Sequence, residues 1–454
     1  MAGCRLLTRM PAGVVRILAC LLLAAMVYAS APPSEGLRAG LAIFALVGSL
    51  WMTQAMHLSV TALLVPLLAV LAGLMDLRTA LAAFAHPVIF LFLGGFALAA
   101  ALQQQGLDRA LATQVMRLAA GRRDVAVALV FVLTALLSMW ISNTATAAMM
   151  LPLALGLLRD DDGAGERAFV LLGVAYSASI GGIGTLVGSP PNAIAAAQAG
   201  IGFAEWMRIG VPVVLVLLPL MAAVLFLLLR PRLGAGPASS AGSVEGLPWT
   251  RAQAITLVVF ALTAAGWIGA APLGKALGIT ADLDSAIAVA AIITLVATGN
   301  IGWPDIERRT QWGVLLLFGG GLALSEVMAI SSASRFLADG VTHMLEAAPP
   351  VLLLLGVVAF VVFLTELVSN TASAALLVPI FLGVATSLGV SPLLFAAAIA
   401  VAASCAFMLP VATPPNALVY GSGQVPQATM MRCGLVLNLL CIVVITVMAS
   451  WVFT

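Results

Sequence analysis

The chain has 454 residues, of which 63% are hydrophobic and 8% are charged, and its formal net charge at pH 7 is +2. A water-soluble fold of this size could not bury so much apolar surface, so the composition excludes a soluble globular protein. The apolar stretches run continuously in Leu, Ala, Val and Ile, without the alternation of a membrane β-barrel. The sequence therefore predicts an all-α polytopic membrane protein, and nothing in it predicts a nucleic-acid partner.

A helix needs roughly 20 apolar residues to span the ~30 Å hydrocarbon core of a membrane. Windows of that kind predict about eleven transmembrane helices, whose outer surfaces contact membrane lipids. Residues 1–31 also resemble a secretory signal, but the apolar run is nearly long enough to span, so we expect an uncleaved first helix. The expected crossings cover residues 14–31, 38–54, 58–75, 87–105, 168–199, 209–229, 252–271, 284–300, 311–330, 392–423 and 433–453.

Two halves of the chain carry the same three motifs in the same order. The first half reads LFLGGF at 91–96, SNTATAAMMLPLALG at 142–156 and GSPPNAIA at 188–195. The second half reads LLFGGG at 316–321, SNTASAALLVPIFLG at 369–383 and ATPPNALV at 412–419. The matching positions are 224–227 residues apart. Three motifs in one order at one spacing predict an internal repeat, as many transporters have.

Two further apolar segments, 125–158 and 350–384, each carry Ser-Asn-Thr near the middle. Each is long enough for two half-length helices, and polar residues at bilayer depth are tolerated where they line a protein cavity. We therefore predict two re-entrant hairpins with the tripeptide at each tip. The expected domains are a first helix at 1–36, a first repeat at 37–231 with a broken helix at 168–199, a cytoplasmic linker at 232–250, and a second repeat at 251–454 with a broken helix at 392–423.

The arginines predict the orientation of the chain in the membrane. Arg5, Arg9 and Arg16 place the N-terminus in the cytoplasm, because basic residues concentrate in cytoplasmic loops. Basic residues flank the first hairpin on both sides, whereas only Arg335 precedes the second. Five crossings and one hairpin in each half also reverse the second half, so we predict inverted repeats. High Ala, Gly and Arg with little Lys indicates a GC-rich bacterium and hence an inner-membrane protein.

The two Ser-Asn-Thr tips would meet near the bilayer midplane, where inverted-repeat transporters bind substrate. A helix N-terminus presents free N–H groups and a partial positive charge, which suits an anion. The amides of Asn143 and Asn370 add further donors. Hydroxyl groups come from Ser142, Thr144, Ser369 and Thr371. The sequence therefore predicts two cradles for carboxylate groups.

The second paired motif places consecutive prolines inside an overlong apolar stretch in each half. Proline removes an N–H donor and breaks the helix, which frees the preceding carbonyl groups to bind Na⁺. Ser138 and Thr365, four residues before each tripeptide, offer hydroxyl ligands. No Lys, Arg or His lies in these motifs, so a bound dianion would need cations to offset its charge. This is the physical reason to expect sodium symport.

The two SNT signatures, each followed by a PPN motif, resemble the hallmark of the divalent anion/sodium symporter family, and the resemblance covers essentially the whole chain. It implies a homodimer in which a transport domain moves against a scaffold as an elevator. It implies substrate contacts at Ser142, Asn143, Thr144, Ser369, Asn370 and Thr371, to which we add Pro190 and Pro414. It implies one sodium site at Ser138, Asn143 and Gly188, and another at Thr365, Asn370, Ala412 and Pro414.

We expect Na⁺-coupled uptake of a small dicarboxylate such as succinate, malate or fumarate, since Thr371 leaves the second cradle small and polar. A sodium-independent exchanger and a proton-coupled permease for citrate, sulfate or arsenite are the alternatives. More remote ones are a passive anion channel and an intramembrane enzyme, although HExxH and GxSxG motifs are absent. Glu366 lies near the second tip where the first half has Met139, which favours structural pairing over proton coupling.

The segments 107–117 and 334–346 resemble matching interfacial helices, with apolar residues on one face and charged residues on the other. We expect them to act as arms that join a moving domain to a fixed one.

Overall fold

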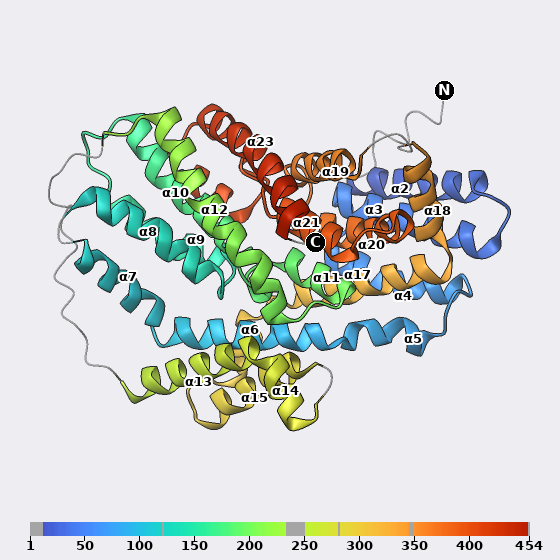
Figure 1. Cartoon of the computed structure of the whole chain (residues 1–454), viewed down its shortest axis with the longest axis horizontal. Helices are drawn as coiled ribbons and strands as arrows, with labels where there is room; N and C mark the ends of the chain where they lie inside the picture. The colour runs from blue at the N-terminus through green and yellow to red at the C-terminus, as the bar shows by residue number, and fades with distance from the viewer. Residues whose placement is uncertain (1–11, 120–121, 233–249, 280–281, 345–348, 453–454) are drawn as a thin grey trace.

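The structure, a computed structural model, describes residues 12–119, 122–232, 250–279, 282–344 and 349–452. Throughout these ranges the regular elements are α-helices and short 3-10 turns (Figure 1), which confirms the all-α prediction. Arg5 and Arg9, the interior of the expected linker 232–250 and the end of the expected arm 334–346 lie outside the described residues.

The first half of the chain begins with helices that pack on one another in sequence, α2 on α3 and α3 on α4. His57 and His86 each cap a helix through Nδ1, which accepts from the N–H two residues later. The elements before the first expected hairpin are α2 (Ala12–Ser30), α3 (Glu35–Thr53), α4 (Leu58–Leu71), α5 (Leu77–Ala82), η1 (Ala83–Ala85), α6 (Pro87–Gln104) and α7 (Leu107–Leu118). Those that follow are α8 (Arg123–Ser138), α9 (Asn143–Gly156), α10 (Ala164–Gly181), η2 (Leu186–Gly188), α11 (Pro190–Ala199) and α12 (Phe203–Leu229).

The second half has the same succession of long, paired and broken helices. Its first elements are α13 (Arg251–Ile268), α14 (Ala270–Leu277), α15 (Leu283–Ala297), α16 (Trp303–Arg309), α17 (Trp312–Ile330) and α18 (Ala333–Met344). The remainder are α19 (Pro350–Thr365), α20 (Asn370–Leu388), α21 (Pro392–Ala403), α22 (Pro414–Gly421) and α23 (Gln427–Val452).

Eight helical segments among the described residues are long and apolar enough to cross a membrane, fewer than the eleven expected crossings. Two expected crossings are shorter as helices, because α4 and α15 have 14 and 15 residues. Two others, 168–199 and 392–423, are interrupted before a proline pair. One of the eight, α20, belongs to an expected hairpin instead. A count based on helix length therefore misses predicted crossings that form short or interrupted helices.

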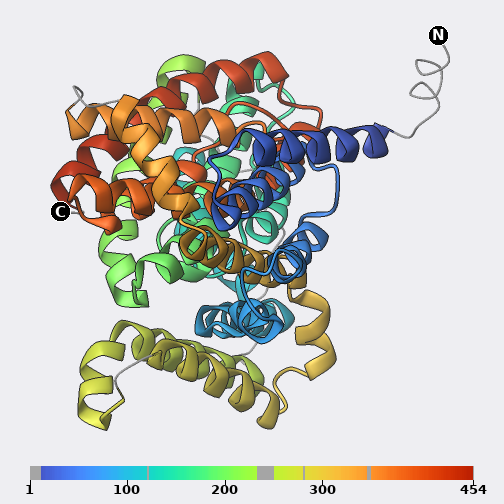
Figure 2. The same cartoon turned by 90° about the vertical axis from the view of Figure 1, so that its right-hand side faces the viewer.

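The broken helices of the two halves interlock. The half-helix α11 of the first half packs against α20 and α21 of the second, and α22 of the second packs against α9 and α10 of the first. By contrast, α13, α14 and α15 form a layer at one edge of the molecule, next to α6 (Figures 1 and 2). We call the interlocked helices, together with α12 that packs on α10, the interlocked core. The layer packs mainly on α6, through α15 and α13, and its main helix contact with the interlocked core joins α13 to α12.

A buried ion pair connects the start of α8 with the turn that follows α9. Arg123, the first residue of α8, donates through Nη1 to Oδ1 of Asp162 (2.8 Å), and its Nη2 donates to the other carboxylate oxygen. The two side chains are 1% and 6% exposed. Asp162 also accepts the Arg159 N–H at 2.9 Å, so it fixes the turn that leads from α9 to α10.

Replacing Asp162 by Ala would leave the Arg123 guanidinium buried and unpaired, and we expect a loss of about 3 kcal/mol in unfolding free energy. Burial raises the pKa of Asp162, but its hydrogen bonds and Arg123 lower it by more, to below the ordinary 3.8. The contribution is therefore complete above that value and lost only as pH falls below it. The apparent unfolding temperature should drop equally at pH 7 and pH 5, whereas Asp161→Ala, an exposed neighbour, should leave it unchanged.

Candidate functional site

Each Ser-Asn-Thr tripeptide lies at the junction of two helices. In the first half α8 ends at Ser138 and α9 begins at Asn143; in the second α19 ends at Thr365 and α20 begins at Asn370. The serine before each second helix is its N-cap, because its Oγ accepts from the backbone N–H three residues on, at 3.4 Å and 3.5 Å. Each serine hydroxyl therefore also has a structural role.

The N-termini of α9 and α20 follow these caps and carry the remaining tip residues. Asn143 and Thr144 open one helix, and Asn370 and Thr371 open the other. The first N–H groups of a helix have no partner within it, and the helix dipole makes this end partly positive. All four side chains are at least partly accessible, and Thr144 is exposed. The tips thus present two helix N-termini and their polar side chains on accessible surface.

Behind the first tip, four oxygen-bearing groups converge. Ser138 Oγ, which is buried, donates to the carbonyl oxygen of Ala178 at 2.6 Å. The amide of Asn143 presents one terminal atom to three oxygens: Ser138 Oγ at 2.7 Å, Ala178 O at 3.1 Å and Gly188 O at 3.3 Å. If that atom is the nitrogen it can donate to all three. If it is the oxygen, four oxygens face one another and suit a hard cation. We call this group the first oxygen cluster.

A second oxygen cluster repeats the arrangement in the other half. Thr365 Oγ1 lies 2.5 Å from Asn370 Oδ1 and 3.0 Å from the carbonyl oxygen of Ala403. Thr365 is fully buried, as Ser138 is. Ala403 follows Ala178 by 225 residues, the spacing of the repeats. Each hydroxyl therefore lies behind its tip, Ser138 against the last turn of α10 and Thr365 against the last turn of α21.

The breaks that expose these carbonyl groups are held by the asparagines of the PPN motifs. Asn192 donates through Nδ2 to the carbonyl oxygens of Gly182 (2.8 Å) and Thr185 (2.7 Å). Asn416 donates in the same way to the matching positions Ala406 and Leu409, both at 3.1 Å. Each amide fixes the chain between the two parts of a broken helix.

The prolines and the carbonyl residues before them lie where these breaks end. Pro190 and Pro414 are the first residues of α11 and α22. Pro414 is exposed, Pro190 and Ala412 are partly accessible, and Gly188 is buried. Of the residues expected to bind sodium through their carbonyl groups, only Gly188 has a described contact with a cluster.

Two hydrogen bonds join the halves at these breaks. Ser189 Oγ lies 3.4 Å from Ser404 Oγ, and Tyr176 of α10 donates its hydroxyl to the carbonyl oxygen of Phe407 at 2.7 Å. These bonds connect the break of the first half with that of the second. Sequence reasoning missed the carbonyl groups of Ala178 and Ala403 and the roles of Asn192 and Asn416. Only the two asparagines carried a signal, since they belong to the paired motif.

Comparison with known proteins shows the family of this chain. The model of the citrate transporter family matches residues 49–400. An uncharacterized transporter of Haemophilus influenzae is 49% identical over 421 residues, which cover 90% of this chain and 91% of that one. A sodium-dependent dicarboxylate transporter of Staphylococcus saprophyticus is 33% identical over 444 residues, covering 89% and 84%. The chain belongs to the citrate transporter family.

These matches also confirm the resemblance to the divalent anion/sodium symporters, and they make the chain a multi-pass membrane transporter. Among solved structures, the YdaH transporter of Alcanivorax borkumensis is similar in fold. Its TM-score is 0.56 at 18% sequence identity, with 83% of this chain and 90% of that chain covered.

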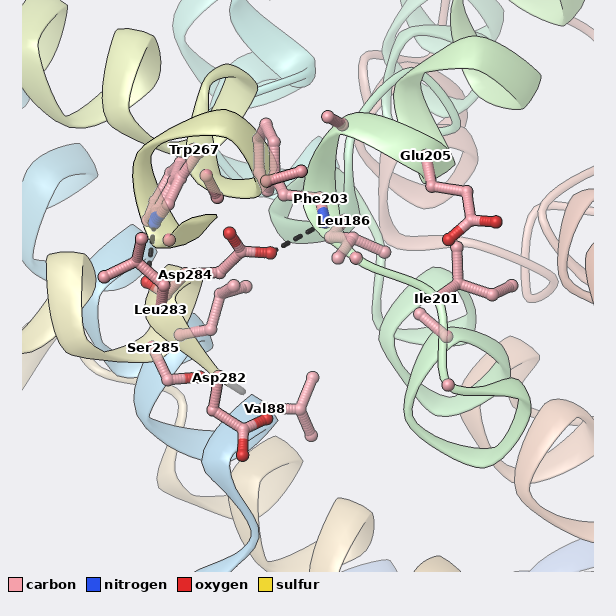
Figure 3. A pocket seen from close by; sticks show the side chains of 18 of the residues that line it. Val88, Leu186, Ile201, Phe203, Glu205, Trp267, Asp282, Leu283, Asp284 and Ser285 are labelled. Carbon is pink, nitrogen blue, oxygen red and sulfur yellow. Dashed lines mark hydrogen bonds between the residues drawn. The ribbon is translucent and has the colours of Figure 1, made fainter. Parts of the chain in front are cut away.

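A cavity of about 790 Å³ lies between the core of this citrate transporter family member and its α13–α15 layer (Figure 3). None of the predicted binding residues lines it. Asp284 of α15 stands at its wall, where Oδ2 accepts the N–H of Phe203, the first residue of α12, at 2.9 Å. Its backbone carbonyl accepts from Trp267 Nε1 at 2.8 Å. Asp284 therefore links the layer to the core.

Trp140, two residues before the first tip, extends this link. Its ring is stacked on that of Trp267 with centroids 6.4 Å apart and planes at 5°. The ring of Phe260 meets it edge-on at 5.0 Å. A short aromatic contact thus connects the tip of the α8–α9 pair with α13.

The absence of a side chain at Gly182 leaves space for the Asn143 amide, because a Cβ at residue 182 would lie 2.3 Å from Asn143 Oδ1. A cation site at Asn143 predicts that Gly182→Ala displaces the amide and raises the half-saturating Na⁺ concentration for uptake by roughly 10-fold or more, as changes beside a metal ligand do. Gly356→Ala is the matched control, since no atom lies within 4 Å of its added Cβ. Equal Na⁺ dependence of the two variants would contradict a cation site at Asn143.

Proposed function

We propose that this transporter couples the uptake of a small dicarboxylate, such as succinate, malate or fumarate, to Na⁺. The observation that carries the proposal is the pairing of each accessible helix N-terminus with an oxygen cluster directly behind it. The amide of Asn143 or Asn370 belongs to both, so one side chain can face an anion on one side and a cation on the other. Such a shared residue is a direct route for coupling.

The composition of the clusters supports a cation. Hydroxyl, amide and carbonyl oxygens are the ligands that hard cations take in proteins, and no Lys, Arg or His belongs to the tips. The Asn143 amide presents one atom to three oxygens within 3.3 Å. Rotating the Asn143 amide would replace its nitrogen, a hydrogen-bond donor, with its oxygen, which can bind a cation. Ser138, Asn143 and Gly188 would hold one Na⁺, and Thr365, Asn370, Ala412 and Pro414 the other.

Electrostatics supports symport over exchange or a channel. A dicarboxylate at the tips meets helix dipoles and amides but no fixed positive charge, so bound cations stabilise it in a low-dielectric site. Linkage then requires the anion to raise cation affinity by the same factor. The named activity of the Staphylococcus saprophyticus relative, sodium-dependent dicarboxylate transport, is consistent with this coupling.

We further propose that the interlocked core moves as one body against a scaffold that includes the α13–α15 layer, as an elevator in each subunit of a homodimer. The helices α7 and α18 would be the connecting arms. We place the protein in a bacterial inner membrane with its N-terminus in the cytoplasm. The few contacts of the layer with the core, through Asp284 and Trp140, support a separable interface.

Labelled succinate uptake into proteoliposomes tests the proposed coupling. We expect accumulation driven by an inward Na⁺ gradient in the parent and its loss in Asn143→Ala with Asn370→Ala, since the double variant removes both shared amides. Asn300→Ala removes a buried amide that bonds to Ala252 and Thr256 instead, and should keep Na⁺-driven uptake.

Other outcomes of that assay would point elsewhere. Uptake that ignores Na⁺ but needs internal anion would identify an exchanger, and downhill flux without accumulation a channel. Absence of succinate uptake would redirect the assay to citrate and sulfate.

Crosslinking tests the proposed movement. Phe203→Cys with Asp284→Cys would join α12 to α15, and we expect oxidation to stop uptake and reductant to restore it, while Na⁺ still raises the unfolding temperature. Pro87→Cys with Ser285→Cys joins α6 to α15 at an existing hydrogen bond of 2.7 Å and should leave uptake intact after oxidation. Unchanged uptake by the oxidised first pair would rule out separation of these helices.

A further inference from the structure

Glu366 is a buried carboxylate at the end of α19, next to Thr365 of the second oxygen cluster. It is 3% exposed. Its Oε1 accepts the backbone N–H groups of Phe407 (2.7 Å) and Met408 (2.8 Å), and its Oε2 accepts that of Leu409 (2.9 Å). One carboxylate therefore binds three successive amides of the chain that joins α21 to α22.

A fourth hydrogen bond comes from α23, where Asn438 Nδ2 donates to Glu366 Oε1 at 2.7 Å. In the part of the chain that the structure describes, no basic side chain forms an ion pair with Glu366. Four donors directed at two oxygens favour the ionised form.

In the first half the backbone N–H groups at the break are bound without a charged side chain. Met139 stands where the second half has Glu366. The corresponding amides of Ile183 and Gly184 bond instead to the carbonyl groups of Ile180 (3.1 Å) and Gly181 (2.9 Å) in local turns. The two oxygen clusters are thus alike in their ligands and unlike in their surroundings.

We propose that Glu366 is a positioning residue that makes the second oxygen cluster the stronger of two cation sites. Glu366 directly follows Thr365 in the chain, and its carboxylate holds the segment that leads to Ala412. A negative charge near a bound cation strengthens binding in a low-dielectric interior, and the matching position of the first half has the neutral Met139. A cation therefore fills the second site at a lower concentration than the first. This proposal rests on the proposed Na⁺ coupling.

The Na⁺ dependence of succinate uptake, together with the Na⁺-induced rise in unfolding temperature, measures this effect. Glu366→Gln keeps the shape of the side chain and removes its charge, and should raise the half-saturating Na⁺ concentration on the order of tenfold. Met139→Gln, the same new residue at the matching position of the first half, should leave it within about threefold of the parent.

Moving the negative charge from residue 366 to residue 438 separates its electrostatic effect from the hydrogen bonds that Glu366 makes to the loop. In Glu366→Gln combined with Asn438→Asp the carboxylate moves across the existing 2.7 Å hydrogen bond, while the three loop amides keep only the single amide oxygen of the new glutamine as acceptor in place of two carboxylate oxygens. We expect this double variant to recover most of the Na⁺ affinity at a lowered unfolding temperature. A purely structural role for Glu366 would give no recovery.

An unaltered Na⁺ dependence in Glu366→Gln, or a tenfold rise that the double variant retains, overturns the proposal. If Glu366→Gln does not fold, the double variant alone decides by the same criterion. A parent protein without any Na⁺ dependence would overturn the coupling itself, and the role of Glu366 with it. A Na⁺-dependent parent with an unaffected Glu366→Gln overturns the role of Glu366 alone.

Discussion

Backbone groups inside a membrane must find partners within the protein, because lipid offers none. The two tips and the two broken helices each free such groups, and specific side chains bind several of them. Ser142 and Ser369 cap the helices at the tips, and Asn192 and Asn416 bind the carbonyl groups at the breaks. The groups that remain, helix N–H groups in front and clustered oxygens behind, are those that suit an anion and a cation.

The sequence predicted much of this site because the residues that satisfy the interruptions are polar and therefore stand out in an apolar chain. The tripeptides, Ser138, Thr365 and the proline pairs all belong to motifs that occur twice. Ala178 and Ala403 did not stand out, since they contribute main-chain carbonyl groups that any residue carries. The partner of Asp284 was equally hidden, because a contact between residues 81 positions apart in the chain has no local pattern.

Helix lengths were the other point at which the sequence fell short. Hydropathy gives the extent of an apolar stretch, but the turns inside it depend on which backbone groups find other partners. The stretches 168–199 and 392–423 read as long crossings with a break, and the structure ends α10 at Gly181 and α21 at Ala403, several residues before the prolines. The intervening segments are the ones that Asn192, Asn416 and Glu366 hold.

The interlocking of the halves gives these local arrangements a collective consequence. α11 packs on α20, which starts at the second tip, and α22 packs on α9, which starts at the first tip. A displacement at the break of one half is therefore transmitted to the helix that starts at the tip of the other half. Ligands bound at either cluster would therefore act on a single packed unit, whose halves are also joined by the bonds of Ser189 with Ser404 and of Tyr176 with Phe407. In such a unit two cations and an anion can favour one another without direct contact, by each stabilising the same arrangement of the breaks.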